Sequence, residues 1–182
     1  MTCLLSTIRH DLRRKAEWCY TRSDRRAMLK VLFTDGTAAM ILYRLMQWSG
    51  HHRLRPLEML FNKLNAVLCN CIIGRGAEFG PGLVLIHSTG VVINGQVRAG
   101  RGVYIEHQVT IGAERRLCPT LGDEVFIGAG AKIIGGVTVG DNTRIGANAV
   151  VLGDVPSNHS AVGIPARMIP PAFAEPERAC AA

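Results

Sequence analysis

The chain has 182 residues, 48% of them apolar, and a formal net charge of +7 at pH 7. This composition suits one medium-sized domain with a hydrophobic core, and it excludes a collagen-like chain, a disordered chain and a disulfide-rich miniprotein. No apolar run approaches the roughly 18 residues of a membrane-spanning helix. The N-terminus lacks the features of a secretory signal, and the six cysteines show no zinc-binding spacing. We therefore expect a cytoplasmic protein with reduced thiols.

The positive charge is concentrated in the N-terminal third. Residues 1–66 contain 12 Lys and Arg against 5 Asp and Glu, whereas residues 67–182 contain 9 of each. The excess is compatible with a solvated helix face, and also with peripheral contact to the inner membrane. We do not expect nucleic acid as a partner.

Residues 1–66 are predicted to form a small α-helical region. Only two of the twenty glycines precede residue 67. Helices are expected over residues 6–20, 24–33, 38–50 and 56–66. The Asp35-Gly36 pair marks the turn between the second and third helices, and Pro56 suits the first turn of the fourth.

Residues 67–168 repeat with a period of six. From Leu121 to Val151 an aliphatic residue recurs at every sixth position, followed four residues later by a small or β-branched residue. This period fits neither an α-helix nor a hairpin, and it is typical of a parallel β-helix with three short strands in each coil. The repeat extends upstream to Val67 with a two-residue and a four-residue insertion. It predicts 14 repeats in four to five coils, followed by a C-terminal tail over residues 169–182.

The repeat places two histidines at one corner. His87 and His107 are each the third residue of their repeats, which start one coil plus the two-residue insertion apart. An imidazole is well suited to general-base catalysis near neutral pH. His87 is the first candidate for that base. His107 is either functional or solvated, and Glu106 either orients an imidazole or faces solvent. The loop with Cys118 is expected to reach the same edge.

Two segments carry a resemblance to a known family. The run from GAGAKIIGG to VGIPARMI and the segment LIHSTGVVING resemble the serine acetyltransferase family of hexapeptide acyltransferases, over roughly residues 25–170. The resemblance implies a left-handed β-helix, a homotrimer with the active site between subunits, and acetyl transfer from acetyl-CoA to a hydroxyl group, without a metal. His87 aligns with the general base of the family. The coenzyme-binding positions implied by the resemblance are Ala129, Gly130, Arg144, Ala147 and Arg167.

Three positions depart from the family pattern. Ile72 stands where the family has the aspartate that partners the catalytic histidine, and Ile86 replaces the aspartate before that histidine. Cys118 replaces a second histidine that helps to bind the carboxylate of serine. His87, His107 and Cys118 together also resemble acetyltransferases of polysaccharide biosynthesis. The family default favours L-serine as the acceptor, whereas these substitutions favour a sugar hydroxyl. We name L-serine first, because the overall match is to that family, and keep the sugar hydroxyl as the alternative.

Two alternatives to an acetyltransferase are compatible with the sequence, a zinc-binding protein and an inactive scaffold. Related β-helix trimers of the γ-carbonic anhydrase type bind zinc through histidines, and His87 with His107 would supply two such ligands. An inactive scaffold anchored by the basic helices is a further alternative. The chain ends in Ala rather than the Ile that family members insert into their sulfhydrylase partner, so no cysteine synthase complex is expected.

Overall fold

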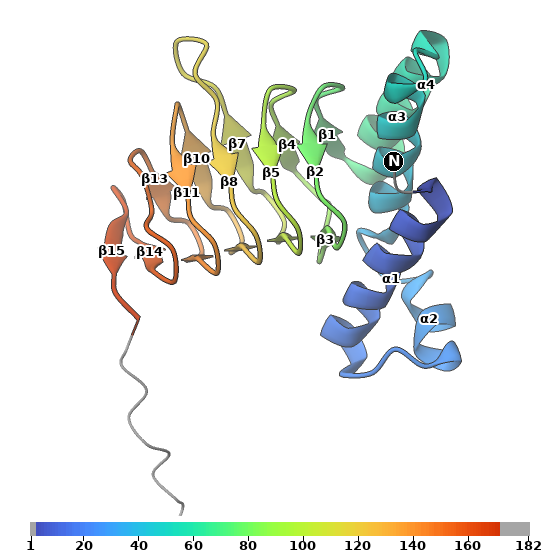
Figure 1. Cartoon of the computed structure of the whole chain (residues 1–182), viewed down its shortest axis with the longest axis horizontal. Helices are drawn as coiled ribbons and strands as arrows, with labels where there is room; N and C mark the ends of the chain where they lie inside the picture. Colours follow the sequence, from blue (N-terminus) through green and yellow to red (C-terminus); the bar gives the residue numbers. More distant parts are fainter. Residues whose placement is uncertain (1–2, 172–182) are drawn as a thin grey trace, which may run out of the picture.

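The computed structural model describes residues 3–171, which form four helices followed by a parallel β-solenoid (Figure 1). The helices are α1 (Leu4–Tyr20), α2 (Arg25–Val31), α3 (Thr37–His51) and α4 (Arg55–Cys69). They confirm the four predicted helical segments to within a few residues. Within residues 3–171, no helix combines the length and the apolar character needed to cross a bilayer.

The start of the solenoid differs from the prediction. Val67 lies in α4, and 78% of its surface is exposed, so the predicted repeat at Val67 is wrong. The helix continues to Cys69 and ends where Asn70 adopts the left-handed conformation, with φ of 46°. A single apolar residue at the right spacing could not show that the helix runs three residues further.

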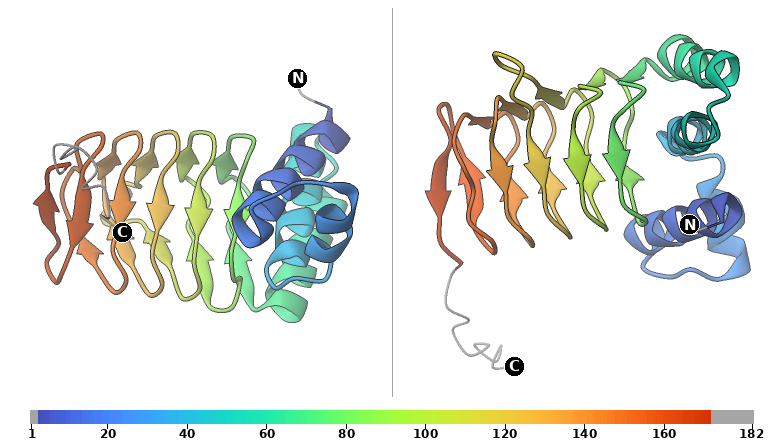
Figure 2. Two further views of the ribbon diagram at one scale, coloured as in Figure 1. Left: turned by 90° about the horizontal axis from the view of Figure 1, so that it is seen from below. Right: turned by 45° about the horizontal axis from the view of Figure 1, so that its top comes forward.

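The strands form three sheets, one on each face of about five coils, and all pairs in them are parallel except that of β14 with β15 (Figure 2). Sheet A contains β1 (Cys71–Ile73), β4 (Val91–Ile93), β7 (Thr110–Gly112), β10 (Lys132–Ile134) and β13 (Val150–Val151). Sheet B contains β2 (Glu78–Phe79), β5 (Arg98–Ala99), β8 (Thr120–Leu121) and β11 (Thr138–Val139). Sheet C contains β3 (Val84–Leu85), β6 (Tyr104–Ile105), β9 (Phe126–Ile127), β12 (Arg144–Ile145), β14 (Ser160–Val162) and β15 (Arg167–Ile169).

The six-residue register is confirmed from β1 onward. Ile73 pairs with Ile93, which pairs with Ile111, which in turn pairs with Ile133. These side chains are at most 2% exposed and form a continuous ladder inside the coils. Both insertions lie at corners, so they lengthen the loops and leave the register unchanged.

The last coil departs from the repeat. Val139 bridges to Val155, so this coil is shorter than the others, and β15 pairs with β14 in the antiparallel direction. The hairpin of β14 and β15 covers the outer edge of sheet C, where another parallel strand would otherwise be able to pair. Residues 172–182, most of the predicted tail, lie outside the described residues.

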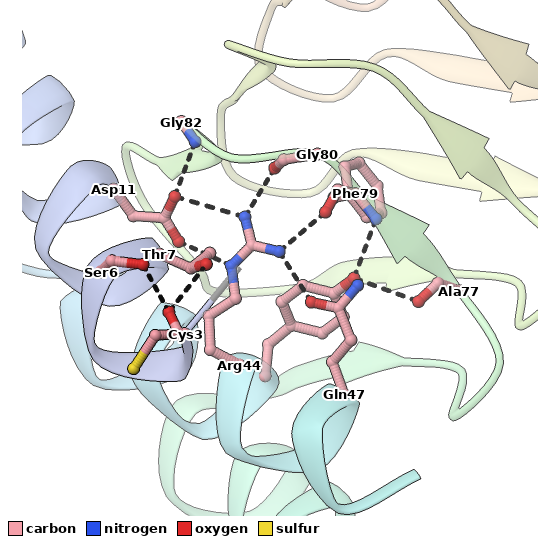
Figure 3. Close-up of polar contacts among 11 residues, drawn as sticks. Cys3, Ser6, Thr7, Asp11, Arg44, Gln47, Ala77, Phe79, Gly80 and Gly82 are labelled. Carbon is pink, nitrogen blue, oxygen red and sulfur yellow. Dashed lines mark hydrogen bonds and ion pairs between the residues drawn. The ribbon is translucent and has the colours of Figure 1, made fainter. Parts of the chain in front are cut away.

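The helices pack against the first coil through a buried ion pair (Figure 3). Arg44 of α3 donates from Nε to Asp11 of α1 at 2.6 Å, and its other nitrogens donate to the carbonyl oxygens of Phe79 and Gly80, each at 2.7 Å. Asp11 also accepts the backbone N–H of Gly82 at 2.7 Å. Both charged side chains are at most 2% exposed. The pair therefore joins two helices to the corner of the first coil between β2 and β3.

We predict that Arg44→Ala strongly destabilises the protein. The substitution leaves the carboxylate of Asp11 and two carbonyl groups buried without their partner, which typically costs about 3–5 kcal/mol. Urea unfolding followed by circular dichroism measures this loss. The matched control is Arg13→Ala, because Arg13 forms an exposed pair with Glu17, and such pairs contribute little. Equal losses in the two variants would contradict the role given to Arg44.

Candidate active site

His87 and His107 lie together at the corner where sheet C passes into sheet A. His87 follows β3 and His107 follows β6, one coil further along. Their ring centroids are 5.8 Å apart, and the ring planes meet at 75°. The predicted stacking of the two histidines is therefore confirmed. Their side chains are 50% and 45% exposed, so both are accessible from solvent.

A groove of about 590 Å³ runs from the two histidines along this corner. The predicted site residues that line it are His87, Glu106, His107, Ala129, Arg144 and Ala147. Its floor is formed where consecutive coils turn at Gly128 and Gly146. A Cβ at Gly128 would lie 2.7 Å from the backbone nitrogen of Ala147, so only glycine allows the coils to stack this closely. The result is a groove that is open to solvent.

Arg144 brings positive charge to the groove. Its guanidinium carbon lies 4.7 Å from the ring centroid of Phe126, on the outer face of sheet C. Stacking on the aromatic face restrains the guanidinium group and leaves its N–H donors available. The groove therefore combines an imidazole at one end with a cation along its side.

Three predicted site residues lie outside the groove. Gly130 sits at the same corner and donates its N–H to the carbonyl of His107 at 2.9 Å, but does not line the groove. Arg167 lies on β15 opposite Val162, which does line it. Cys118 lies elsewhere, with its Sγ 3.3 Å from Oδ1 of Asn94.

The prediction that Cys118 shares an edge with the two histidines is wrong for a single chain. Its loop follows β7, which belongs to sheet A, and leads into β8 of sheet B (Figure 1). The loop therefore leaves the solenoid at the next corner, one face beyond the histidines. Counting repeats gave the coil correctly but assigned the loop to the wrong corner.

Asp35 is a site residue that sequence reasoning missed. Its Oδ2 lies 2.9 Å from Nδ1 of His87, although the two residues are far apart in the chain. The sequence marked Asp35 only as part of a turn between helices, and nothing near it signals a contact with the solenoid. Glu106 contacts His107 instead, with Oε2 3.6 Å from Nδ1. Ile72, at the position of the family aspartate, is an apolar residue on β1 and half exposed.

Lys15 and Gly36 place Asp35 beside His87. The buried ammonium group of Lys15 donates to the carbonyl oxygen of Asp35 and, at 2.7 Å, to that of Leu85. Gly36 has φ of 76°, and a Cβ there would clash with the same Leu85 oxygen. Burial lowers the pKa of Lys15 to about 8, opposed by the nearby Cys19 and Asp35. The turn at Asp35 is thus attached to the end of β3, two residues before His87.

The described residues offer little for a metal ion. Between residues 3 and 171, no three His, Cys, Asp or Glu side chains are grouped so that they could hold one. His87 and His107 lie close enough to act together, but no third side chain of these types completes the set within one chain.

Comparisons with known proteins agree with this architecture. Residues 118–153 match the family model described as bacterial transferase hexapeptide (six repeats). The serine acetyltransferase of Synechococcus elongatus is 37% identical over 143 residues, which cover 76% of this chain and 59% of that protein. The serine acetyltransferase of Helicobacter pylori strain J99 is 39% identical over 143 residues, covering 76% and 84%.

A solved structure of a serine acetyltransferase in complex with CoA has a TM-score of 0.83 to this chain and 28% sequence identity. The match covers 91% of this chain and 69% of that one. Of the two relatives described above, the chain spans less than two thirds of the Synechococcus protein and most of the Helicobacter protein.

We predict that Lys15 makes stability rise with pH in alkaline solution. Its pKa is about 8 in the folded protein and about 10.5 in the unfolded chain. Below pH 8 both states are protonated, and burying the charge lowers stability. Between the two values the folded protein has released a proton that the unfolded chain still holds, so the free energy of unfolding increases through this window.

Urea unfolding at several pH values tests this for wild type and Lys15→Met. The unfolding free energy of wild type minus that of Lys15→Met should increase as the pH rises from 8 to 10.5. Lys30→Met, which removes an exposed lysine, is the matched control for the loss of a lysine side chain. A flat difference for Lys15→Met would contradict the prediction.

Proposed function

The chain belongs to the serine acetyltransferase family, and from this membership we propose that it transfers an acetyl group from acetyl-CoA to the hydroxyl group of L-serine. The single observation that carries the proposal is the groove that begins at His87 and passes Arg144. The two relatives described above are both serine acetyltransferases, which supports serine over a sugar as the acceptor.

In the proposed reaction His87 is the general base. The imidazole takes the proton of the acceptor hydroxyl while the oxygen attacks the thioester carbonyl carbon. The C–S bond then breaks, and the imidazolium returns the proton to the sulfur of the departing coenzyme. Backbone N–H groups directed at the carbonyl oxygen would stabilise the negative charge that develops on it. His107 lies close enough to influence His87, and Glu106 to influence His107.

The groove fits the shape of the proposed co-substrate. Coenzyme A has a long, flexible arm with a thiol at one end and phosphates at the other. The floor at Ala129 and Ala147 would hold the arm with the thioester next to His87. Arg144 would bind a phosphate, because a guanidinium group offers paired N–H donors. The complex of a solved relative with CoA supports this proposal.

We propose that the active form is a homotrimer, as expected from the family. Half of each histidine side chain is exposed in the single chain, which leaves room for a neighbouring subunit beside the groove. The loop between β7 and β8 extends from another corner (Figure 1). In a trimer, the same loop of a neighbour would bring Cys118 to the site.

We predict that wild-type protein releases the thiol of CoA from acetyl-CoA when L-serine is the only acceptor. His87→Ala should lower kcat by about 10²–10⁴-fold, the usual contribution of a general base, and retain acetyl-CoA binding. A thiol-reactive dye measures release, and light scattering shows whether each variant has the same mass as wild type. The control is His51→Ala, because His51 is an exposed residue of α3 that does not line the groove.

Two results would contradict the proposal in different ways. Full activity of His87→Ala would show that another group removes the proton. No serine-dependent release from a folded protein that binds acetyl-CoA would reject serine, and release with a sugar acceptor would then favour the polysaccharide alternative.

A further inference from the structure

We propose that Asp35 is the positioning residue for His87. A residue of the helical region would then orient the general base that the solenoid carries. The inference rests on the proposed function, in which His87 removes the proton of the acceptor. It is carried by the 2.9 Å contact between Oδ2 of Asp35 and Nδ1 of His87. Asp35 would supply the carboxylate that an apolar Ile72 cannot.

The contact selects one tautomer of the imidazole. An ionised carboxylate only accepts hydrogen bonds, so Nδ1 of His87 carries the hydrogen and donates it to Asp35. In the neutral ring, Nε2 is then the unprotonated nitrogen and is available to accept a proton. When the ring becomes charged during the reaction, the same carboxylate faces the new positive charge. Asp35 thus fixes both the orientation of the ring and the nitrogen that acts.

The hydrogen bond matters more than the charge of Asp35 in this arrangement. The side chains of Asp35 and His87 are 55% and 50% exposed, so water screens their Coulomb attraction. Orientation by a hydrogen bond does not depend on that attraction, but it requires the carboxylate to be held in place. Oδ1 of Asp35 accepts the N–H of Gly36 at 2.8 Å, which leaves Oδ2 directed at the histidine.

Three segments hold this carboxylate in position. Lys15 of α1 binds the backbone of Asp35 and of Leu85 at once. Gly36 allows the turn to lie directly against the carbonyl oxygen of Leu85. Because Leu85 lies two residues before His87, the turn and the base are fixed to the same short stretch of chain. An exposed turn residue without such a purpose would not need a buried lysine beneath it.

Asp35→Asn tests the inference with little change in shape. The amide oxygen can still accept the N–H of Gly36, but the amide nitrogen faces Nδ1 and donates to it. Nδ1 must then accept, and the hydrogen moves to Nε2, where it blocks the base. We expect kcat with L-serine to fall by about 100-fold, the lower range for loss of a general base, while KM for acetyl-CoA stays unchanged. Asp35→Glu should restore part of the activity.

The matched control is Asp24→Asn. Asp24 is an exposed aspartate that caps α2, and asparagine caps a helix equally well. The tautomer is measured directly by NMR of protein labelled with ¹⁵N at histidine, above the pH at which the ring is charged. Wild type and Asp24→Asn should show Nε2 of His87 without hydrogen, and Asp35→Asn should show Nδ1 without hydrogen.

The outcomes separate this inference from the proposed function. If Asp35→Asn keeps full activity and the wild-type tautomer while His87→Ala is inactive, the positioning role is overturned and the function stands. If wild type releases no CoA with any acceptor, the function fails, and the NMR result still decides whether Asp35 sets the tautomer. A loss of activity without a tautomer change would also overturn the inference.

An independent observation concerns the exposed surface of α1 and α2. We infer that the α1–α2 patch, defined by Arg9, Arg13, Arg25, Leu29, Leu32 and Phe33, binds an anionic membrane surface. Leu29 and Phe33 are 64% and 92% exposed, and Leu32 is 44% exposed. Arg9, Arg13 and Arg25 line a groove of about 630 Å³ beside Leu29 and Leu32.

The combination matches the chemistry of a lipid surface. Projecting apolar side chains insert at the boundary of headgroups and acyl chains, and the arginines around them are attracted to anionic headgroups. Neighbouring Arg26 and Lys30 of α2 add two further exposed cations. A solvated helix face would not require Phe33 to project almost fully into water.

Sedimentation with vesicles tests this patch. Full-length protein should bind phosphatidylcholine vesicles that contain phosphatidylglycerol, release at high salt, and bind pure phosphatidylcholine weakly. The double variant Leu29→Ser, Phe33→Ser should lose most binding, whereas Leu117→Ser, in the exposed loop after β7, should not. No binding by wild type, or equal loss in the control, overturns the inference. If wild type does not bind vesicles and light scattering gives the double variant a different mass from wild type, the patch forms a contact between copies of the chain instead.

Discussion

One buried guanidinium group sets how the helices sit on the solenoid. Arg44 binds Asp11 of α1 and two carbonyl oxygens of the first coil, and without Arg44 the buried carboxylate would have no cation beside it and would keep only the N–H of Gly82. The first coil has no preceding coil on which to stack, so the helices cover its end (Figure 2). Because Arg44 binds side chain and backbone at fixed points, it leaves little freedom to the packing of α1 and α3. The turn between α2 and α3 is then brought next to His87.

The residues of the site are consequently placed in two different ways, one by the repeat of the solenoid and the other by the packing of the helices. The solenoid provides the groove and the two histidines through repetition, since equal spacing of coils places equivalent residues above one another. The helical region provides Asp35 through docking, which depends on Lys15, Gly36 and the Arg44 pair. Under the proposed function, activity would therefore depend on the packing of the helices, although no residue of α1–α4 lines the groove.

The repeat predicted more of this molecule than the individual residues did. Ile73, Ile93 and Ile111 stack as counted, because strand pairing tolerates insertions only at corners. The same count failed for Val67, where a helix continued through an apolar position, and for Cys118, where the loop leaves at a different corner. Both errors occur where the six-residue repeat is interrupted. At such positions the period does not show where a helix ends or at which corner a loop leaves the solenoid.

The sequence by itself determined the β-helix, the helical N-terminal region and the stacking of His87 on His107. These follow from local spacing, because helical periodicity, a period of six and a fixed register are properties of neighbouring residues. The family was indicated by the resemblance of two segments, and not by spacing. Only the tertiary structure decided what accompanies His87. Asp35 reaches it across 52 residues of chain through the docking of helices on a coil, and that contact depends on buried groups from three separate segments. The spacing of residues in the sequence does not predict this contact, because the packing of the helices, and not the repeat, brings Asp35 to His87.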